Sequence, residues 1–71
     1  MHFIFTAHAM DRMFARGVSK EEVKEIVLKG AKFGPNSRGL MHSRLYEIEV
    51  VYDKKDSTYR IVTLFRVKEG D

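Results

Sequence analysis

Three side chains in one short segment have the types and spacing that phosphate chemistry requires. His8, Arg12 and Arg16 are each four residues apart, so in a helix they line up along one flank. Arginine binds phosphate through two parallel hydrogen bonds, and histidine can transfer protons near neutral pH. The row is therefore a candidate phosphate-binding site with a titratable group at its end, although each residue taken singly also fits an ordinary solvated helix surface.

A second group of candidates lies in a stretch that contains no acidic residue. Residues 26–46 lack aspartate and glutamate, whereas residues 41–71 carry six basic and six acidic side chains. A one-sided positive patch of this kind binds polyanions such as RNA, but a basic loop can also simply keep a small protein soluble. The basic and histidine side chains of the stretch are Lys29, Lys32, Arg38, His42 and Arg44.

Length and composition narrow the function classes. The chain has 71 residues, a net charge of +3 and no cysteine, which predicts one domain with a small core over residues 1–71 and no disulfide or thiolate site. The three histidines lack metal-ligand spacing and no cofactor motif occurs, so we expect neither a metal nor a cofactor. No leader and no run of 18 apolar residues is present, so we expect a cytoplasmic protein with no membrane partner.

Two capped helices must position the first group of candidates. Thr6 begins the first helix and Gly17 ends it, with apolar residues at Ala7, Met10, Met13 and Phe14 expected to form its buried face. Ser19 and Glu22 form a capping box at the start of the second helix, and Gly30 ends it. The connection between the helices is so short that they must form a tight corner.

The remaining residues indicate strands. His2–Phe5 is a short apolar run that we expect at a sheet edge, and Lys32 and Phe33 fit a short extended piece before a turn-rich loop. The stretches 44–53 and 58–67 alternate and predict one antiparallel hairpin. The side chains expected to face the helices are Tyr46, Ile48, Val50, Ile61 and Phe65.

Charge suggests the register of that hairpin. If Asp53 opposes Arg60, then Val51 opposes Val62 and Glu47 opposes Arg66, which gives two opposite-charge pairs. Arg60 is then either a cross-strand partner or a ligand for RNA. The outer face of the sheet carries apolar residues between arginines, a composition that suits nucleic acid or a partner peptide.

The segment FTAHAMDRMFARGVSKEEV resembles a family of small prokaryotic proteins known only as a domain of unknown function, DUF4258. The family pattern is a strand, then T-x-H-A-x-x-R-x-x-x-R-G-I/V-S/T-x-x-E-I/V, then a hairpin ending near a V-T pair. The resemblance covers nearly the whole chain. The matching residues are Thr6, His8, Ala9, Arg12, Arg16, Gly17, Val18, Ser19, Glu22, Val23, Gly30, Val62 and Thr63.

The resemblance implies an α+β fold with a short N-terminal strand and a two-helix corner packed on one face of a small antiparallel sheet. This order of elements is similar to that of the RelE/ParE and BrnT toxins and of the barnase-like ribonucleases. It implies a toxin-like, metal-independent endoribonuclease, and a non-catalytic module that binds RNA or an antitoxin-like protein is the alternative. We expect the catalytic residues to be His8, Arg12 and His42. We expect the RNA-binding residues to be Arg16, Lys29, Lys32, Arg38, Arg44 and Arg60.

Overall fold

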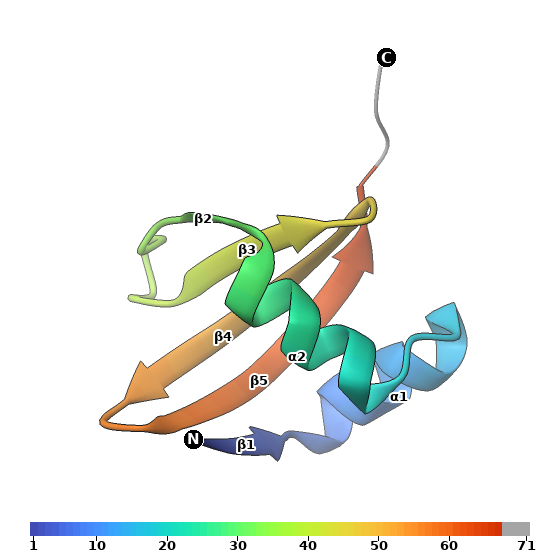
Figure 1. Cartoon of the computed structure of the whole chain (residues 1–71), viewed down its shortest axis with the longest axis horizontal. Coiled ribbons are helices and arrows are strands. Elements are labelled where there is room, and N and C mark those ends of the chain that lie inside the picture. Colours follow the sequence, from blue (N-terminus) through green and yellow to red (C-terminus); the bar gives the residue numbers. More distant parts are fainter. Residues whose placement is uncertain (68–71) are drawn as a thin grey trace.

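The computed structural model describes residues 1–67 as a small α+β domain with five strands and two helices (Figure 1). This is the expected fold class. The elements in chain order are β1 (His2–Phe5), α1 (Ala7–Arg16), α2 (Lys20–Lys29), β2 (Ala31–Phe33), β3 (Met41–Leu45), β4 (Ile48–Lys55) and β5 (Thr58–Arg66).

One sheet contains all five strands in the order β1-β5-β4-β3-β2. Strands β2 to β5 form an antiparallel meander, and β1 adds in parallel to the start of β5. Both helices follow β1 directly and contribute to one core with the sheet, so they lie on the same side of it (Figure 1). The expectation that His2–Phe5 forms an edge strand is confirmed.

The helix ends lie where the capping residues predicted them. The Thr6 hydroxyl accepts from the amide of Ala9, and Gly17 ends α1 with φ +68°. At α2, the Ser19 hydroxyl accepts from the amide of Glu22, and the Glu22 carboxylate accepts from the amide of Ser19. Both helix boundaries are therefore set by local sequence.

The buried face of α1 differs from the expected one. Ala9 and Met13 are buried in the core, whereas Phe14 is 91% exposed and Met10 is 46% exposed. Ala9 and Met13 are four residues apart and both contact the sheet through one narrow stripe. The prediction that Met10 and Phe14 face the core was wrong, because a helix at the side of a small sheet buries less than half of its circumference.

The stretch 44–53 is not one strand. It is interrupted by a tight turn at Tyr46 and Glu47, whose φ angles are +56° and +61°. Two successive positive φ angles are the geometry of a type I′ hairpin turn. The chain therefore reverses between β3 and β4, and this hairpin was missing from the sequence-based prediction.

A β-bulge between β4 and β5 changes which residues of β5 face the helices. Asp53 pairs with Arg60 as expected, but after the irregularity Val51 pairs with Thr63 and Ile48 pairs with Arg66. The expected pairings of Val51 with Val62 and of Glu47 with Arg66 were therefore wrong. Leu64 enters the core and Phe65 lies on the other face, because one extra residue reverses the alternation.

The two faces of the sheet consequently have different characters. The face toward the helices carries the apolar core, which includes Ile48, Val50, Tyr52, Ile61 and Leu64. The opposite face, called here the outer face, carries no helix within residues 1–67. Phe33 and Phe65 are partly exposed on it, whereas Glu49 and Val51 are buried by their neighbours on the same face.

Candidate functional site

Two rows of paired residues cross the outer face. In the first row Ala31 pairs with Arg44, Arg44 with Glu49, and Glu49 with Phe65. In the second row Phe33 pairs with His42, His42 with Val51, and Val51 with Thr63. Directly paired residues point to the same face of a sheet, so these rows bring polar, charged and aromatic side chains together.

Glu49 lies at the centre of a cluster that we call the His42 cluster, made of Asn36, His42, Arg44 and Glu49. One Glu49 carboxylate oxygen is 2.5 Å from Nδ1 of His42, and the other accepts from Nη2 and Nε of Arg44 at 3.1 and 3.3 Å. Glu49 is only 5% exposed. A carboxylate this buried requires charge-assisted partners, and here it has two.

The hydrogen bonds of Asn36 determine the tautomer of His42. The Asn36 Oδ1 atom accepts from the amides of Arg38 and Leu40, so its Nδ2 atom is the donor to Nε2 of His42 at 3.0 Å. Nε2 must then carry the lone pair, and Nδ1 must carry the proton that Glu49 accepts. The hydrogen-bond pattern therefore places the lone pair of His42 on Nε2, the ring atom that faces Asn36.

The aromatic ring of Phe33 borders this cluster and contacts two of its members. The ring of Phe33 is stacked against His42 with 5.4 Å between ring centres, and the Arg44 guanidinium carbon is 5.6 Å from the Phe33 ring centre. Phe33 is nevertheless 42% exposed. The cluster thus combines a proton acceptor, a guanidinium and an open aromatic surface.

The row of His8, Arg12 and Arg16 lies elsewhere. All three residues are on α1, as expected, but α1 packs beside β5 on the core side, whereas His42 lies on the outer face of β3. The Arg12 guanidinium contacts the carboxylate of Asp11 at 3.1 Å. The structure therefore brings His42 together with Arg44, and it does not bring His8 or Arg12 to them.

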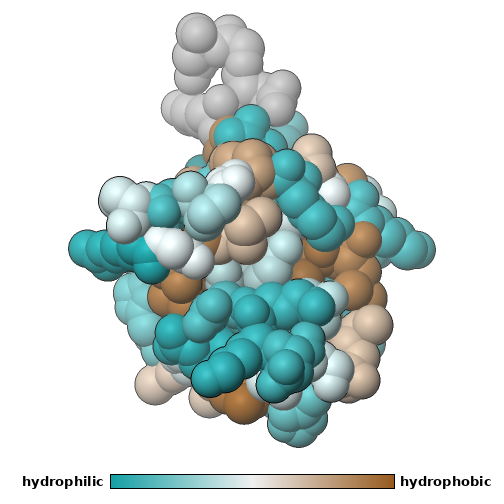
Figure 2. All heavy atoms as spheres, turned by 90° about the vertical axis from the view of Figure 1, so that its left-hand side faces the viewer, coloured by the Kyte–Doolittle hydropathy of each residue, from teal (hydrophilic) through white to brown (hydrophobic). Residues whose placement is uncertain are grey.

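The other basic candidates are spread over several parts of the surface. Lys29 is exposed at the end of α2, and Arg38 is exposed in the loop after β2. The Lys32 ammonium donates to the carbonyls of Leu28 and Gly30. Arg60 lies on β5 with its guanidinium 3.7 Å from the Asp53 carboxylate. The side that holds the loop after β2 is largely hydrophilic, with apolar atoms in small separate areas (Figure 2).

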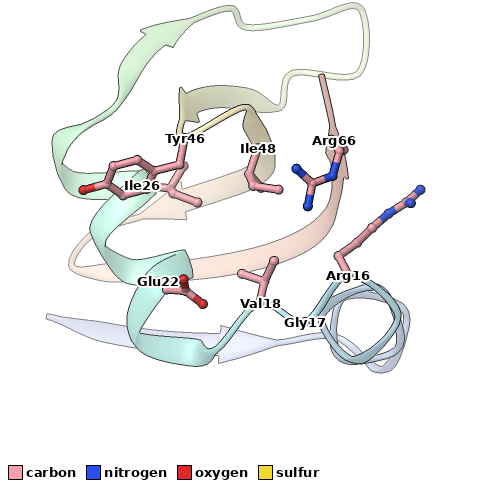
Figure 3. A pocket seen from close by; sticks show the side chains of 8 residues that line it. All are labelled: Arg16, Gly17, Val18, Glu22, Ile26, Tyr46, Ile48 and Arg66. Atoms are coloured by element: carbon pink, nitrogen blue, oxygen red, sulfur yellow. The ribbon is translucent and has the colours of Figure 1, made fainter. Parts of the chain in front are cut away.

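Arg16 belongs to a different feature, a pocket of about 150 Å³ on the helix side of the sheet (Figure 3). Val18, Ile26 and Ile48 form its apolar part, and Arg66 lies at its rim near Arg16. The pocket is separated from the His42 cluster by the sheet, because Ile26 and Ile48 belong to the core between sheet and helices.

Tyr46 also lines this pocket and links the β3–β4 turn to α2. Its hydroxyl donates to the carboxylate of Glu25 at 3.0 Å. The hydrogen bond and the negative charge of Glu25 raise the pKa of the Tyr46 phenol above its ordinary value. The phenol therefore remains protonated at neutral pH and acts as a donor.

Within residues 1–67, no group of three or more His, Cys, Asp or Glu side chains is arranged to hold a metal ion. Neither α1 nor α2 is long and apolar enough to cross a membrane.

The comparison with known families supports the family that the sequence resembles. The profile of the family described as Domain of unknown function (DUF4258) matches residues 5–66. The chain belongs to this family. No curated protein and no solved structure gave a match. The DUF4258 match runs from the last residue of β1 to the last residue of β5 and thus includes both the α1 row and the His42 cluster.

His42 and Arg44 of the candidate site were expected from the sequence, whereas Phe33, Asn36 and Glu49 were not. His42 and Arg44 are two residues apart, and in a strand this spacing places both on one face. This spacing predicts a shared face only if Met41–Leu45 is assigned as a strand. The expected strand began at residue 44 and therefore did not include His42. Asn36 lies in a turn-rich loop, where no periodicity indicates a partner.

Proposed function

We propose that this DUF4258 protein is a metal-independent endoribonuclease of the toxin type, with His42 as general base. The observation that carries the proposal is the pair of contacts that His42 makes, from Nδ1 to the Glu49 carboxylate and from Nε2 to the Asn36 amide. These contacts fit the tautomer with the proton on Nδ1 and the lone pair on Nε2. An imidazole oriented by a carboxylate is the arrangement that general-base catalysis uses. Acting on RNA would place the protein in the cytoplasm.

The proposed reaction is an internal phosphoryl transfer within RNA. Nε2 of His42 takes the proton of a ribose 2′-hydroxyl, and the 2′-oxygen attacks the adjacent phosphorus. The bond from phosphorus to the 5′-oxygen breaks, giving a 2′,3′-cyclic phosphate and a 5′-hydroxyl whose proton comes from water. The hydroxide that remains takes the proton from Nε2 of His42, which regenerates water and the general base. Arg44 stabilises the extra negative charge on the phosphoryl oxygens, and Glu49 stabilises the imidazolium that forms.

The second candidate is a binding module without catalysis, for RNA or for an antitoxin-like protein. It is favoured by the contact between Asn36 and Nε2 of His42, since that atom already has a partner. Catalysis requires Asn36 to move away from Nε2 when RNA binds. Asn36 lies in the exposed loop between β2 and β3, where such a movement disturbs no core packing.

Cleavage of labelled single-stranded RNA in the presence of a chelator tests the proposal. We expect wild type to yield 2′,3′-cyclic phosphate ends and His42→Ala to lose at least about a hundredfold in rate, since general-base catalysis contributes this much. His8→Ala is the matched comparison, because His8 is exposed on α1, and we expect it to retain activity.

Three outcomes would count against this assignment. Absence of cleavage by wild type would favour the binding module. An equal loss of cleavage rate in His8→Ala and His42→Ala would mean that His8 on α1 takes part in catalysis. Cleavage by His42→Ala at an unchanged rate would show that His42 is not the general base. The toxin-type role is tested by expression in a bacterial host with and without the neighbouring reading frame, with growth and RNA integrity as readouts.

A further inference from the structure

The outer face carries two exposed aromatic rings on opposite sides of the His42 cluster. Phe33 on β2 is 42% exposed and Phe65 on β5 is 38% exposed. Phe33 directly opposes His42, and Phe65 directly opposes Glu49. Because β2 and β5 are separated by β3 and β4, the two rings lie three strand spacings apart, about 14 Å across the sheet. They are also two residues, about 7 Å, apart along the strands.

The bulge between β4 and β5 determines that Phe65 lies on the outer face. The bulge between Val51 and Tyr52 places Leu64 in the core and leaves Phe65 outside. An aromatic ring left partly open on a sheet face without a covering helix is a surface on which an unpaired base can stack. Phe33 is in the same situation, since both its neighbours on this face, His42 and Arg44, leave much of the ring open.

The charges on the outer face are largely paired. Arg44 is paired with Glu49, and Arg60, in the row beyond His42, is 3.7 Å from Asp53. A polyanion gains little from such a face by charge alone. Stacking on exposed rings is the other main source of affinity for nucleic acid, and it requires bases that are not paired in a duplex.

We propose that the outer face binds a segment of single-stranded RNA, with one base stacked on Phe33, another on Phe65, and the backbone between them crossing Arg44 and His42. This inference rests on the proposed function and specifies its substrate as unpaired RNA. A duplex is excluded because its bases are already stacked on one another. A protein partner fits less well, because a polar cluster separates the two rings and leaves no continuous apolar patch.

Binding of an oligonucleotide that cannot be cleaved tests the inference separately from catalysis. The probe is a fluorescent ten-residue uridine RNA with 2′-O-methyl groups, used alone and annealed to its complement. We expect wild type to bind the single strand at least about tenfold more tightly than the duplex, because only the single strand offers bases for stacking. Phe33→Ala and Phe65→Ala should each weaken binding of the single strand by about fivefold to a hundredfold.

Phe14→Ala is the matched control, since Phe14 is the most exposed phenylalanine and lies on α1. It should change affinity less than about twofold, within the spread of surface substitutions. Phe33→Trp and Phe65→Trp should bind at least as tightly as wild type, because tryptophan retains a stacking surface. The tryptophan variants also show whether a weak alanine variant lost a ring or lost its fold.

The inference is overturned if duplex and single strand bind equally, if the probe does not bind, or if Phe14→Ala loses as much affinity as Phe33→Ala. Binding of an unstructured peptide in place of RNA, sensitive to the same alanine substitutions, would also overturn it in favour of a protein partner. Binding that behaves as expected, without cleavage of unmodified RNA, leaves this inference standing and contradicts the catalytic proposal alone.

Discussion

At the scale of single residues, Glu49 is the side chain on which the outer-face cluster depends. Its carboxylate is buried on a face that has no covering helix, because His42, Arg44 and neighbouring side chains enclose it. Removing the charge of a buried carboxylate leaves its cationic partner without compensation, which costs more than the pair itself contributes.

Replacing Glu49 with glutamine should therefore destabilise the fold by about 2 kcal/mol, the range for hydrogen bonds to charged groups. The free energy of unfolding is measured by urea denaturation at neutral pH. Glu47→Gln is the control, since Glu47 is exposed and its carboxylate is 4.0 Å from the Arg66 guanidinium. A surface pair of this kind contributes less than about 1 kcal/mol. Equal effects of the two substitutions would mean that burial of Glu49 has no energetic consequence.

The candidate site could be predicted only in part from the sequence. His42 and Arg44 were identified by residue type, and their common face follows from their spacing once a strand is assigned. The role of Glu49 could not be found in this way, because it depends on the register between β3 and β4. That register is set by a turn at Tyr46 and Glu47, which contains neither glycine nor asparagine, the residues that usually indicate a type I′ turn.

At the scale of elements, the sequence predicted best those features that are local. The ends of α1 and α2 follow from capping residues within four positions of each end. The bulge in β5 and the choice between Leu64 and Phe65 for the core depend on contacts with the helices, which no short window of sequence contains. Capping residues therefore predicted the ends of the helices, whereas tertiary packing determined which strand residues face the helices.

The junction between α2 and β2 depends on the absence of a side chain at Gly30. A Cβ atom there would lie 2.6 Å from the Ile26 carbonyl oxygen and 2.6 Å from Oγ of Ser43. The Ser43 hydroxyl itself donates to the Ile26 carbonyl, at the end of α2, so this point holds the helix against β3. Gly17 differs, because its φ is +68° but open space surrounds it.

Gly30→Ala should consequently cost about 3 kcal/mol through overpacking against backbone atoms. Gly17→Ala should cost about 1 kcal/mol, the strain of a non-glycine residue in the left-handed region. Thermal or urea unfolding of both variants measures the difference. Ser19→Ala, which removes one half of the capping box, should cost about 1 kcal/mol and provides a reference for a purely local change. A Gly30→Ala variant as stable as Gly17→Ala would show that α2 can shift away from β3 at little cost.

At the scale of the whole molecule, the fold separates charges that the sequence places together. The stretch 26–46 has no acidic residue, yet it passes from α2 through the loop after β2 to β3. Lys29 lies on the helix, Lys32 binds backbone carbonyls, and Arg44 is paired with Glu49. The basic residues of the acid-free stretch therefore lie on different elements, and the charge of Arg44 is paired with a carboxylate. A net charge of +3 is therefore a poor guide to how strongly the protein attracts nucleic acid.

The salt dependence of RNA binding should accordingly be shallow. If the outer face neutralises about two phosphates of a single strand, through Arg44 and Arg60, the logarithm of the binding constant should fall with the logarithm of salt concentration with a slope of about −1.4. Affinity for the uridine probe would then drop about sevenfold between 50 and 200 mM salt. Arg60→Gln should reduce the slope by about 0.7, whereas Lys29→Gln, on α2 away from the outer face, should leave it unchanged.

A slope steeper than about −4 would mean that six or more cations contact phosphate. It would require the basic residues of α2 and of the loop after β2 to join the RNA-binding surface, contrary to the separation of charges described above.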